Sequence, residues 1–278
     1  MPRTRPVGIV VPNTEPDAEK AVRTFPRAAE ELGFSSLWVT DHVVGVRGMA
    51  PVHGPFWLDA VTCLAHLAAT TSVARLGIGV LVVPYRNPVL TAKMLTTIDL
   101  LSDGRLDIGV GTGWSRTEYR ALGVRHLFEG RGRATDEALE VMRKCWRGGA
   151  VEHDGEFFSF EHIAFEPTPA QKPHPPLWIG GQSGPALRRA ARLADTWHPH
   201  DLSPEEVRAT GDRLDELACR AVPRSVRIHA TADDIPALAD VVDSYLDAGC
   251  RQVVIEFRSV PVETTHECAE KAAAVLFA

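Results

Sequence analysis

Residues 76–114 read LGIGVLVVPYRNPVLTAKMLTTIDLLSDGRLDIGVGTGW, and this stretch decides the fold. It opens with LGIGVLVV, a run of apolar and glycine residues that is typical of a strand covered on both faces. A helical segment begins near Pro88, and a second β-rich run, LDIGV, follows at 106–110. A strand, a helix and another strand in this order indicate two parallel strands joined by a crossover helix.

The same alternation repeats along the rest of the chain, so we expect eight parallel strands, each leading into a helical segment. The expected strands are Val7–Val11, Ser36–Thr40, Leu76–Val83, Leu106–Val110, Leu177–Gly180, Thr196–His198, Val226–Ala230 and Gln252–Phe257. The helical segments are expected to begin near Asp17, Phe56, Pro88, Ser115, Gly184, Ser203, Asp233 and Glu263. Because one such barrel needs roughly 250 residues, the sequence predicts a single (β/α)8 TIM-barrel domain over residues 1–278.

One stretch, Gly148–Pro176, interrupts the rhythm between the fourth and fifth strands. It contains VEHDGEFFSFEHIAFEPTP, in which aromatic and polar residues alternate around Asp154-Gly155, a hairpin turn signal. The competing interpretation is a domain linker, but a flexible tether carries fewer large apolar residues. We therefore expect a hairpin insertion.

The overall composition excludes several classes of protein. With 45% hydrophobic and 24% charged residues, the chain is globular and not disordered. The net charge of -6 repels polyanions, which argues against a nucleic-acid partner. The apolar run before Pro12 is too short for a signal peptide, and no later segment is long enough to span a bilayer. We expect a cytoplasmic protein without a membrane partner.

Residues that follow the strands are the first candidates for function, because the active sites of such barrels lie at the C-terminal ends of the strands. After the second strand come Asp41 and His42, a carboxylate and an imidazole that could hold a cofactor ring and move a proton. Taken alone, a helix-capping aspartate beside a surface histidine explains this pair better. After the fourth strand comes GVGTGW, whose glycines allow a ring or a phosphate to approach the backbone; it is not the dinucleotide fingerprint GxGxxG.

The loop after the fifth strand gives a stronger signal. Gly180, Gly181, Gln182 and Ser183 lead directly into a helix, and free amides at a helix start bind anions. A simple turn rarely needs three glycines in five residues, here Gly180, Gly181 and Gly184, so this loop predicts a phosphorylated ligand.

The sixth strand ends in Trp197, His198 and, two residues later, His200. Two histidines at this spacing suggest a metal, but no acidic or cysteine partner follows at a metal-binding spacing. A packed or hydrogen-bonded pair is the better interpretation, and we assign no metal. Glu118 and Asp195 are interpreted as helix-surface or capping residues.

Together these junctions resemble the bacterial luciferase-like monooxygenase superfamily, in particular its branch that uses the deazaflavin coenzyme F420. Three stretches carry the resemblance, in the same order and at similar spacing: ELGFSSLWVTDHV, the stretch 76–114 quoted above, and LWIGGQSGPALRRAARLADTW. The resemblance implies a barrel that holds the cofactor ring against strands two to four and the phosphate tail on the loop around Gly181. Asp41 and His42 match the residues that contact the ring.

Val80 and Leu81 match a bulge behind the ring, where relatives carry a non-proline cis peptide bond. The cofactor-binding set that the resemblance implies is Asp41, Val80, Leu81, Gly111, Thr112, Gly113, Trp114, Gly180, Gly181, Gln182 and Ser183. Two positions depart from relatives. Trp114 stands where sugar-phosphate dehydrogenases of this branch have a catalytic glutamate, and Thr112 stands where flavin-dependent luciferases have an arginine.

These observations predict an F420-dependent oxidoreductase in which His42 transfers a proton, Asp41 orients the cofactor, and Trp114, Trp197 and His198 line the substrate pocket. An FMN-dependent monooxygenase on the same barrel is the alternative enzyme, and a non-catalytic F420 carrier or sensor is the alternative of another class. The loop Val43–Phe56, expected to roof the pocket, identifies no substrate. Relatives are often dimers, so the resemblance also implies a homodimer.

Overall fold

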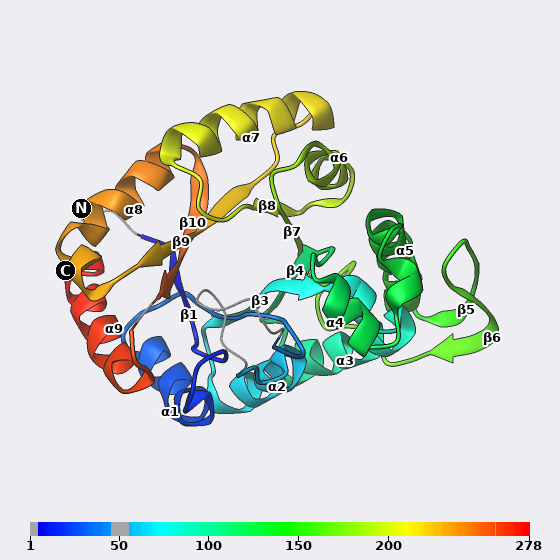
Figure 1. The fold of residues 1–278 in the computed structure, drawn as a ribbon, viewed down its shortest axis with the longest axis horizontal. Helices are drawn as coiled ribbons and strands as arrows, with labels where there is room; N and C mark the ends of the chain where they lie inside the picture. Colours follow the sequence, from blue (N-terminus) through cyan, green and yellow to red (C-terminus); the bar gives the residue numbers. More distant parts are fainter. Residues whose placement is uncertain (1–4, 46–55, 259) are drawn as a thin grey trace.

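The computed structural model describes residues 5–45, 56–258 and 260–278. Its central feature is a closed parallel barrel with the strand order β1-β10-β9-β8-β7-β4-β3-β2, surrounded by helices (Figure 1). The barrel strands are β1 (Val7–Val10), β2 (Ser36–Val39), β3 (Arg75–Val82), β4 (Leu106–Gly111), β7 (Leu177–Gly180), β8 (Thr196–His198), β9 (Arg224–Ala230) and β10 (Cys250–Phe257). Each lies at a predicted position, which confirms the (β/α)8 fold.

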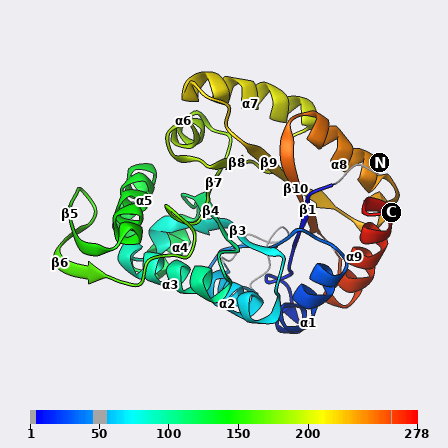
Figure 2. The same ribbon diagram turned by 180° about the vertical axis from the view of Figure 1, so that it is seen from behind.

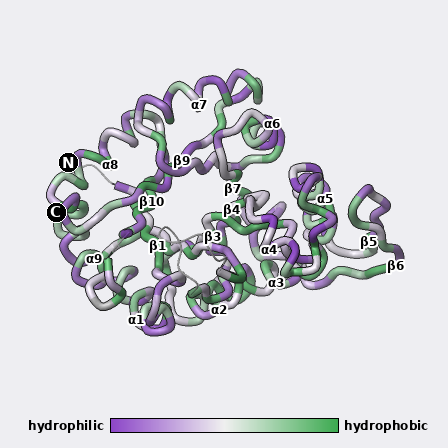
Figure 3. Tube along the Cα trace, in the orientation of Figure 1, coloured by the Kyte–Doolittle hydropathy of each residue, from purple (hydrophilic) through white to green (hydrophobic). Residues whose placement is uncertain are grey.

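The helices form the outer layer. They are α1 (Ala18–Glu31), α2 (Ala60–Thr70), α3 (Pro88–Leu101), α4 (Arg116–Ala121), α5 (Arg131–Arg147), α6 (Gly184–Leu193), α7 (Pro204–Ala218), α8 (Leu238–Asp247) and α9 (Val262–Leu276). Figure 3 shows hydrophobic and hydrophilic residues mixed along the helices, the pattern expected where one helix face packs on the barrel and the other faces solvent. None of the described helices is long and apolar enough to cross a membrane.

Local sequence explains where several helices begin. Asn87 caps α3 through hydrogen bonds from the amides of Val89 and Leu90, and Ser203 caps α7 in a capping box with Glu206. One predicted segment differs from the structure: the helix expected from Ser115 ends at α4, and α5 follows as a separate helix. Gly123 adopts a left-handed conformation (φ 77°) directly after α4, which ends the helix there.

The expected insertion is present as a two-stranded antiparallel hairpin, β5 (Gly149–Asp154) and β6 (Ser159–Phe165), between β4 and β7 in the chain. Figures 1 and 2 both show it at one edge of the molecule, outside the barrel and beside α5. It leaves the closed barrel uninterrupted.

The inside of the barrel is filled by aromatic side chains. Trp38 and Trp178 pack there at a ring distance of 4.9 Å, and the ring of His198 stacks on Trp38 at 5.0 Å. Gly77 makes room for this plug, because a Cβ on Gly77 would lie 2.3 Å from ring atoms of Trp38. The barrel is therefore solid beneath its C-terminal rim, where a ligand can enter.

Candidate functional site

A cavity of about 640 Å³ opens at the C-terminal ends of the strands, within the range of roughly 300–1,000 Å³ that small-molecule sites occupy. Every barrel strand except β1 contributes residues to it from its C-terminal end or the loop after it. The lining residues are Thr40, Asp41, His42, Gly79, Val80, Val82, Val110, Gly111, Thr112, Gly113, Trp114, Glu129, Arg131, Gly132, Gly180, Gly181, Ser183, Pro185, Ala186, Arg189, His198, His200, Arg227, His229 and Arg258.

Most of the predicted site residues lie together on this lining, including Asp41, His42, Val80, residues 111–114, Gly180, Gly181, Ser183 and His198. Leu81 and Trp197 do not. Successive side chains of a strand point to opposite faces, so Val80 and His198 face the cavity while Leu81 and Trp197 enter the core between barrel and helices. Trp197 therefore does not form the predicted pocket wall; its indole nitrogen donates to the carbonyl oxygen of Gly181 at 2.9 Å. Gln182 is exposed and does not line the cavity.

The bulge expected at Val80–Leu81 lies at that point of β3. The pairing of β3 with β4 shifts register between Ile78 and Leu81, and the peptide bond Gly79–Val80 is cis. The cis bond thus lies one peptide unit before the expected position.

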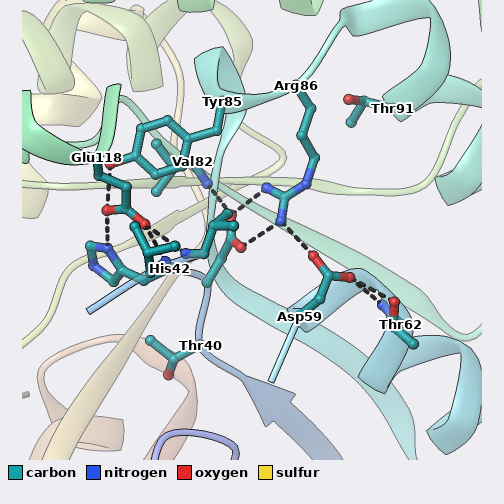
Figure 4. Close-up of polar contacts among 12 residues, drawn as sticks. Thr40, His42, Asp59, Thr62, Val82, Tyr85, Arg86, Thr91 and Glu118 are labelled. Atoms are coloured by element: carbon teal, nitrogen blue, oxygen red, sulfur yellow. Dashed lines mark hydrogen bonds and ion pairs between the residues drawn. The ribbon is translucent and has the colours of Figure 1, made fainter. Parts of the chain in front are cut away.

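The carboxylate of Asp41 is buried and accepts hydrogen bonds from other residues of the chain. Arg86 donates to both of its oxygens at 2.8 Å, and the amide of Val82 donates at 2.9 Å. Nη2 of Arg86 also donates to Oδ2 of Asp59 at 2.9 Å (Figure 4). Burial lowers the pKa of Arg86, but the two aspartates outweigh it and raise that pKa, so the guanidinium stays charged. Asp41 fixes the ends of β2 and β3 relative to each other and thereby shapes the cavity wall.

His42 is paired with a residue that the sequence did not point to. Its Nδ1 lies 2.7 Å from Oε2 of Glu118, which also accepts a hydrogen bond from the hydroxyl of Tyr85 at 2.8 Å (Figure 4). Oε1 of Glu118 accepts from the amide of Val43 at 2.6 Å. Burial raises the pKa of Glu118, but these hydrogen bonds outweigh it and lower that pKa, so the carboxylate is ionised.

The interpretation of Glu118 as a helix-surface residue is wrong, because its side chain is fully buried. Ser115 and Glu118 match the Ser-x-x-Glu pattern of a capping box, which predicts that the glutamate side chain bonds to the backbone at the start of the helix. Ser115 does cap α4 by accepting from the amide of Glu118, but the glutamate side chain turns to His42 instead. Asp195 does act structurally, since it accepts from the amide of Leu177 at 2.8 Å.

The part of the lining around the start of α6 is suited to an anion. Gly181 has a φ of 87°, and Ser183 caps α6 by accepting from the amide of Ala186, so the start of this helix lies on the lining. Arg131, the first residue of α5, lies on the same lining and adds a positive charge. Arg189 also lines the cavity, but its guanidinium pairs with Asp136 at 2.5 Å. The sequence did not point to Arg131, because its pattern does not separate α5 from α4.

The wall formed by β8 to β10 is polar, and His198 is buried in it. Nδ1 of His198 lies 2.7 Å from the hydroxyl of Ser225, whereas its Nε2 has no hydrogen-bond partner among the described residues. Burial, together with the charges of Arg227 and His200, lowers the pKa of His198 to about 3, so its ring is neutral near pH 7. Arg227 is held by Glu256 through Nε at 2.7 Å and by Thr40 at 3.0 Å.

Within residues 5–45, 56–258 and 260–278, no group of three or more His, Cys, Asp and Glu side chains is arranged to hold a metal ion. His198 and His200, the pair that the sequence raised as possible ligands, both lie on the cavity lining. The absence of a metal stays a prediction. Of the loop Val43–Phe56, expected to roof the pocket, residues 46–55 lie outside the described part of the chain.

Comparison with known proteins identifies the family of the chain. The sequence profile of the luciferase-like monooxygenase family matches residues 6–269, and the chain belongs to this family. An uncharacterized protein of Mycobacterium tuberculosis (strain H37Rv) is 31% identical over 249 residues, which cover 84% of this chain and 83% of the relative. The FMNH(2)-dependent dimethylsulfone monooxygenase of Pseudomonas fluorescens is 28% identical over 231 residues, which cover 81% of this chain and 60% of that enzyme.

Among solved structures, an F420-dependent secondary alcohol dehydrogenase in complex with an F420-acetone adduct has a TM-score of 0.79 at 16% identity, with 99% of each chain covered. At this identity the likeness extends to the fold. One of these two proteins is thus named as F420-dependent and the other as FMNH(2)-dependent.

Proposed function

We propose that the protein is an F420-dependent oxidoreductase that transfers a hydride between C5 of the deazaflavin and a small organic substrate. One observation carries the proposal: a single cavity brings together the paired His42, a glycine-rich wall and the anion-binding start of α6. A proton-transfer group, a flat surface and a phosphate site are the three elements that such a reaction needs from the protein.

The residues fit a planar ring that carries a phosphate tail. Gly111 and Gly180 both face Val80, and a Cβ on either glycine would lie 2.5 or 2.9 Å from the methyl groups of that valine. Glycine at both positions therefore leaves room for the Val80 side chain, which lines the cavity and offers an apolar surface for a ring. The α6 amides near Ser183 and the guanidinium of Arg131 would hold the phosphate.

The bound deazaflavin supplies hydride exchange at C5, and the protein supplies the remaining functions. His42 moves a proton to or from the substrate, and Trp114 covers one side of the cavity with an apolar surface. Asp41 holds the cavity wall in place through Arg86. Gly181, Ser183 and Arg131 fix the phosphate tail and thereby the position of the ring.

An FMN-dependent monooxygenase is the second candidate. Arg131 fits it as well as it fits the first candidate, because this arginine supplies on α5 a charge for a flavin phosphate that Thr112 cannot supply. The FMNH(2)-dependent relative supports the same candidate.

The test begins with titration of the protein with F420 and with FMN, followed by absorbance or fluorescence. Saturable binding of F420, followed by its reduction or oxidation with a member of a panel of enones, imines and alcohols, supports the first proposal. Oxygen consumption with reduced FMN and a substrate supports the second. Tight F420 binding without any turnover would identify a carrier and contradict both.

A further inference from the structure

We propose that Glu118 is a positioning residue that keeps a ring hydrogen of His42 on Nδ1, so that Nε2 is the ring nitrogen that takes up or releases a proton. The Glu118 side chain is not among the described residues that line the cavity. It therefore acts through His42. The effect of Glu118 on turnover rests on the proposed function, whereas the position of the ring hydrogen of His42 does not depend on it.

The hydrogen-bond geometry fixes the direction of the bond between the two residues. An ionised carboxylate can only accept hydrogen bonds, so Nδ1 of His42 must donate across the 2.7 Å contact. The other partners of Glu118 are also donors: the amides of Val43 and Val44, at 2.6 and 3.3 Å, and the hydroxyl of Tyr85, at 2.8 Å. Each donor stabilises the ionised form of the carboxylate.

The same contacts hold the imidazole in place. Glu118 belongs to α4, which follows β4, whereas His42, Val43 and Val44 follow β2, so the carboxylate joins two loops of the rim. The His42 ring also packs against Trp57 and Trp114, with ring distances of 4.7 and 5.7 Å. A side chain fixed at Nδ1 and on its faces has little freedom to flip, which is the condition for efficient proton transfer.

This arrangement makes His42 a proton acceptor at Nε2. A substrate carbon gives up its hydrogen with the C–H electron pair as a hydride to the cofactor. The hydroxyl or amino group attached to that carbon then loses its proton to Nε2 of His42. A carbon–oxygen or carbon–nitrogen double bond forms in the substrate, and the imidazolium is stabilised by the charge of Glu118. In the reverse direction the same proton returns to the substrate.

Replacement Glu118→Gln tests the inference, because an amide keeps the shape of the carboxylate and exchanges one acceptor for a donor. The glutamine oxygen can still accept from the amides of Val43 and Val44, while its NH₂ group donates to Nδ1. The hydrogen of His42 must then move to Nε2. Long-range proton–nitrogen NMR spectra of the ring distinguish the two tautomers. They need no cofactor and no turnover.

We expect the wild-type protein to show Nδ1–H at His42 and the Glu118→Gln variant to show Nε2–H. We expect kcat of the variant to fall on the order of 10²–10⁴-fold while the Kd for the cofactor is unchanged. Glu118→Asp, which keeps the charge, should restore the Nδ1–H tautomer and part of kcat. Glu267→Gln is the matched control, since it makes the same chemical change at a surface ion pair with Lys271 on α9.

A wild-type spectrum with the hydrogen on Nε2 would overturn the proposal without any variant. An unchanged tautomer or an unchanged kcat in a folded Glu118→Gln protein would overturn it as well. If the wild-type protein binds neither cofactor nor turns over any substrate, the proposed function fails by itself, and the spectra still decide the role of Glu118.

Discussion

Arg86 donates a hydrogen bond to each carboxylate oxygen of Asp41, from Nη1 to Oδ2 and from Nη2 to Oδ1, at 2.8 Å each. The Asp41 side chain is fully buried, so its removal leaves a charged guanidinium without its main partner. We expect Asp41→Asn to lower the free energy of unfolding by about 3 kcal/mol, because breaking a buried ion pair from one side is strongly destabilising. Urea denaturation measures the change.

A double-mutant cycle separates this pair from its surroundings. Arg86→Met alone should also destabilise, and the double variant should lose less than the sum of the two single variants. Asp59→Asn is the matched control, because Asp59 is 43% exposed and its pair with Arg86 contributes less than about 1 kcal/mol. Additive single effects would show that Asp41 and Arg86 do not depend on each other.

Removal of the His42 imidazole should affect turnover and not cofactor binding. We expect His42→Ala to lower kcat by roughly 10²–10⁴-fold, the contribution of a positioned proton-transfer group, and to leave the Kd for the cofactor unchanged. Steady-state kinetics and a fluorescence titration measure the two quantities. His126→Ala, at an exposed position, serves as the control. Wild-type turnover in the His42 variant would remove this residue from the mechanism.

The space beside Trp38 should tolerate no added methyl group. A Cβ at Gly77 would lie 2.3 Å from ring atoms of Trp38, so Gly77→Ala should destabilise the barrel by about 1–3 kcal/mol through overpacking. Thermal unfolding followed by circular dichroism measures the loss. Trp38→Phe, which shortens the ring system, should recover part of that loss when combined with Gly77→Ala. Equal melting temperatures of wild type and Gly77→Ala would contradict the packing argument.

Arg131 should contribute to affinity only for a ligand that carries a phosphate. We expect Arg131→Met to weaken the binding of F420 or FMN by about 10–100-fold, the effect of a lost charge-assisted hydrogen bond. Riboflavin, which lacks the phosphate, should bind both proteins equally. Arg147→Met, an exposed position on the same helix, provides the control. A loss of riboflavin affinity in the Arg131 variant would mean that this arginine supports the cavity and does not bind phosphate.

The buried His198 should make the protein sensitive to acid. Its pKa is lowered to about 3 in the folded protein by burial and by the charges of Arg227 and His200, and returns to about 6.5 in the unfolded chain. Between these values the unfolded chain binds a proton that the folded protein does not. The free energy of unfolding therefore falls as the pH drops, by up to about 1.4 kcal/mol per pH unit.

His198→Asn removes this titration and keeps an amide that can bond to Ser225 in place of Nδ1. We expect its stability to decrease less steeply than that of the wild type between about pH 6 and about pH 4. Urea denaturation at a series of pH values gives both slopes. Parallel slopes would show that His198 does not titrate in this way.

The strands and most of the rim could be predicted from the sequence, because apolar runs and caps such as Ser203 depend on nearby residues. Asp41, His42 and Gly181 then converge, since the C-terminal ends of parallel strands meet at one rim. The homodimer stays a prediction.

Residues beyond the strand ends could not be predicted in this way. The direction of Glu118 depends on where α4 ends at Gly123, and Arg131 reaches the cavity because of how α5 packs. Whether Trp197 or His198 faces inward depends on the register of a three-residue strand with its neighbours, which its own sequence does not encode.

The aromatic plug of Trp38 and Trp178 also determines the order in which ligands can enter and leave the cavity. Because these rings close the barrel from below, the proposed cofactor and its substrate would share one opening at the C-terminal rim. The molecule that settles deepest must enter first and leave last. We therefore expect ordered binding, in which the cofactor binds before the substrate. A bulky ligand bound at the opening should slow the dissociation of a ligand that lies deeper in the cavity.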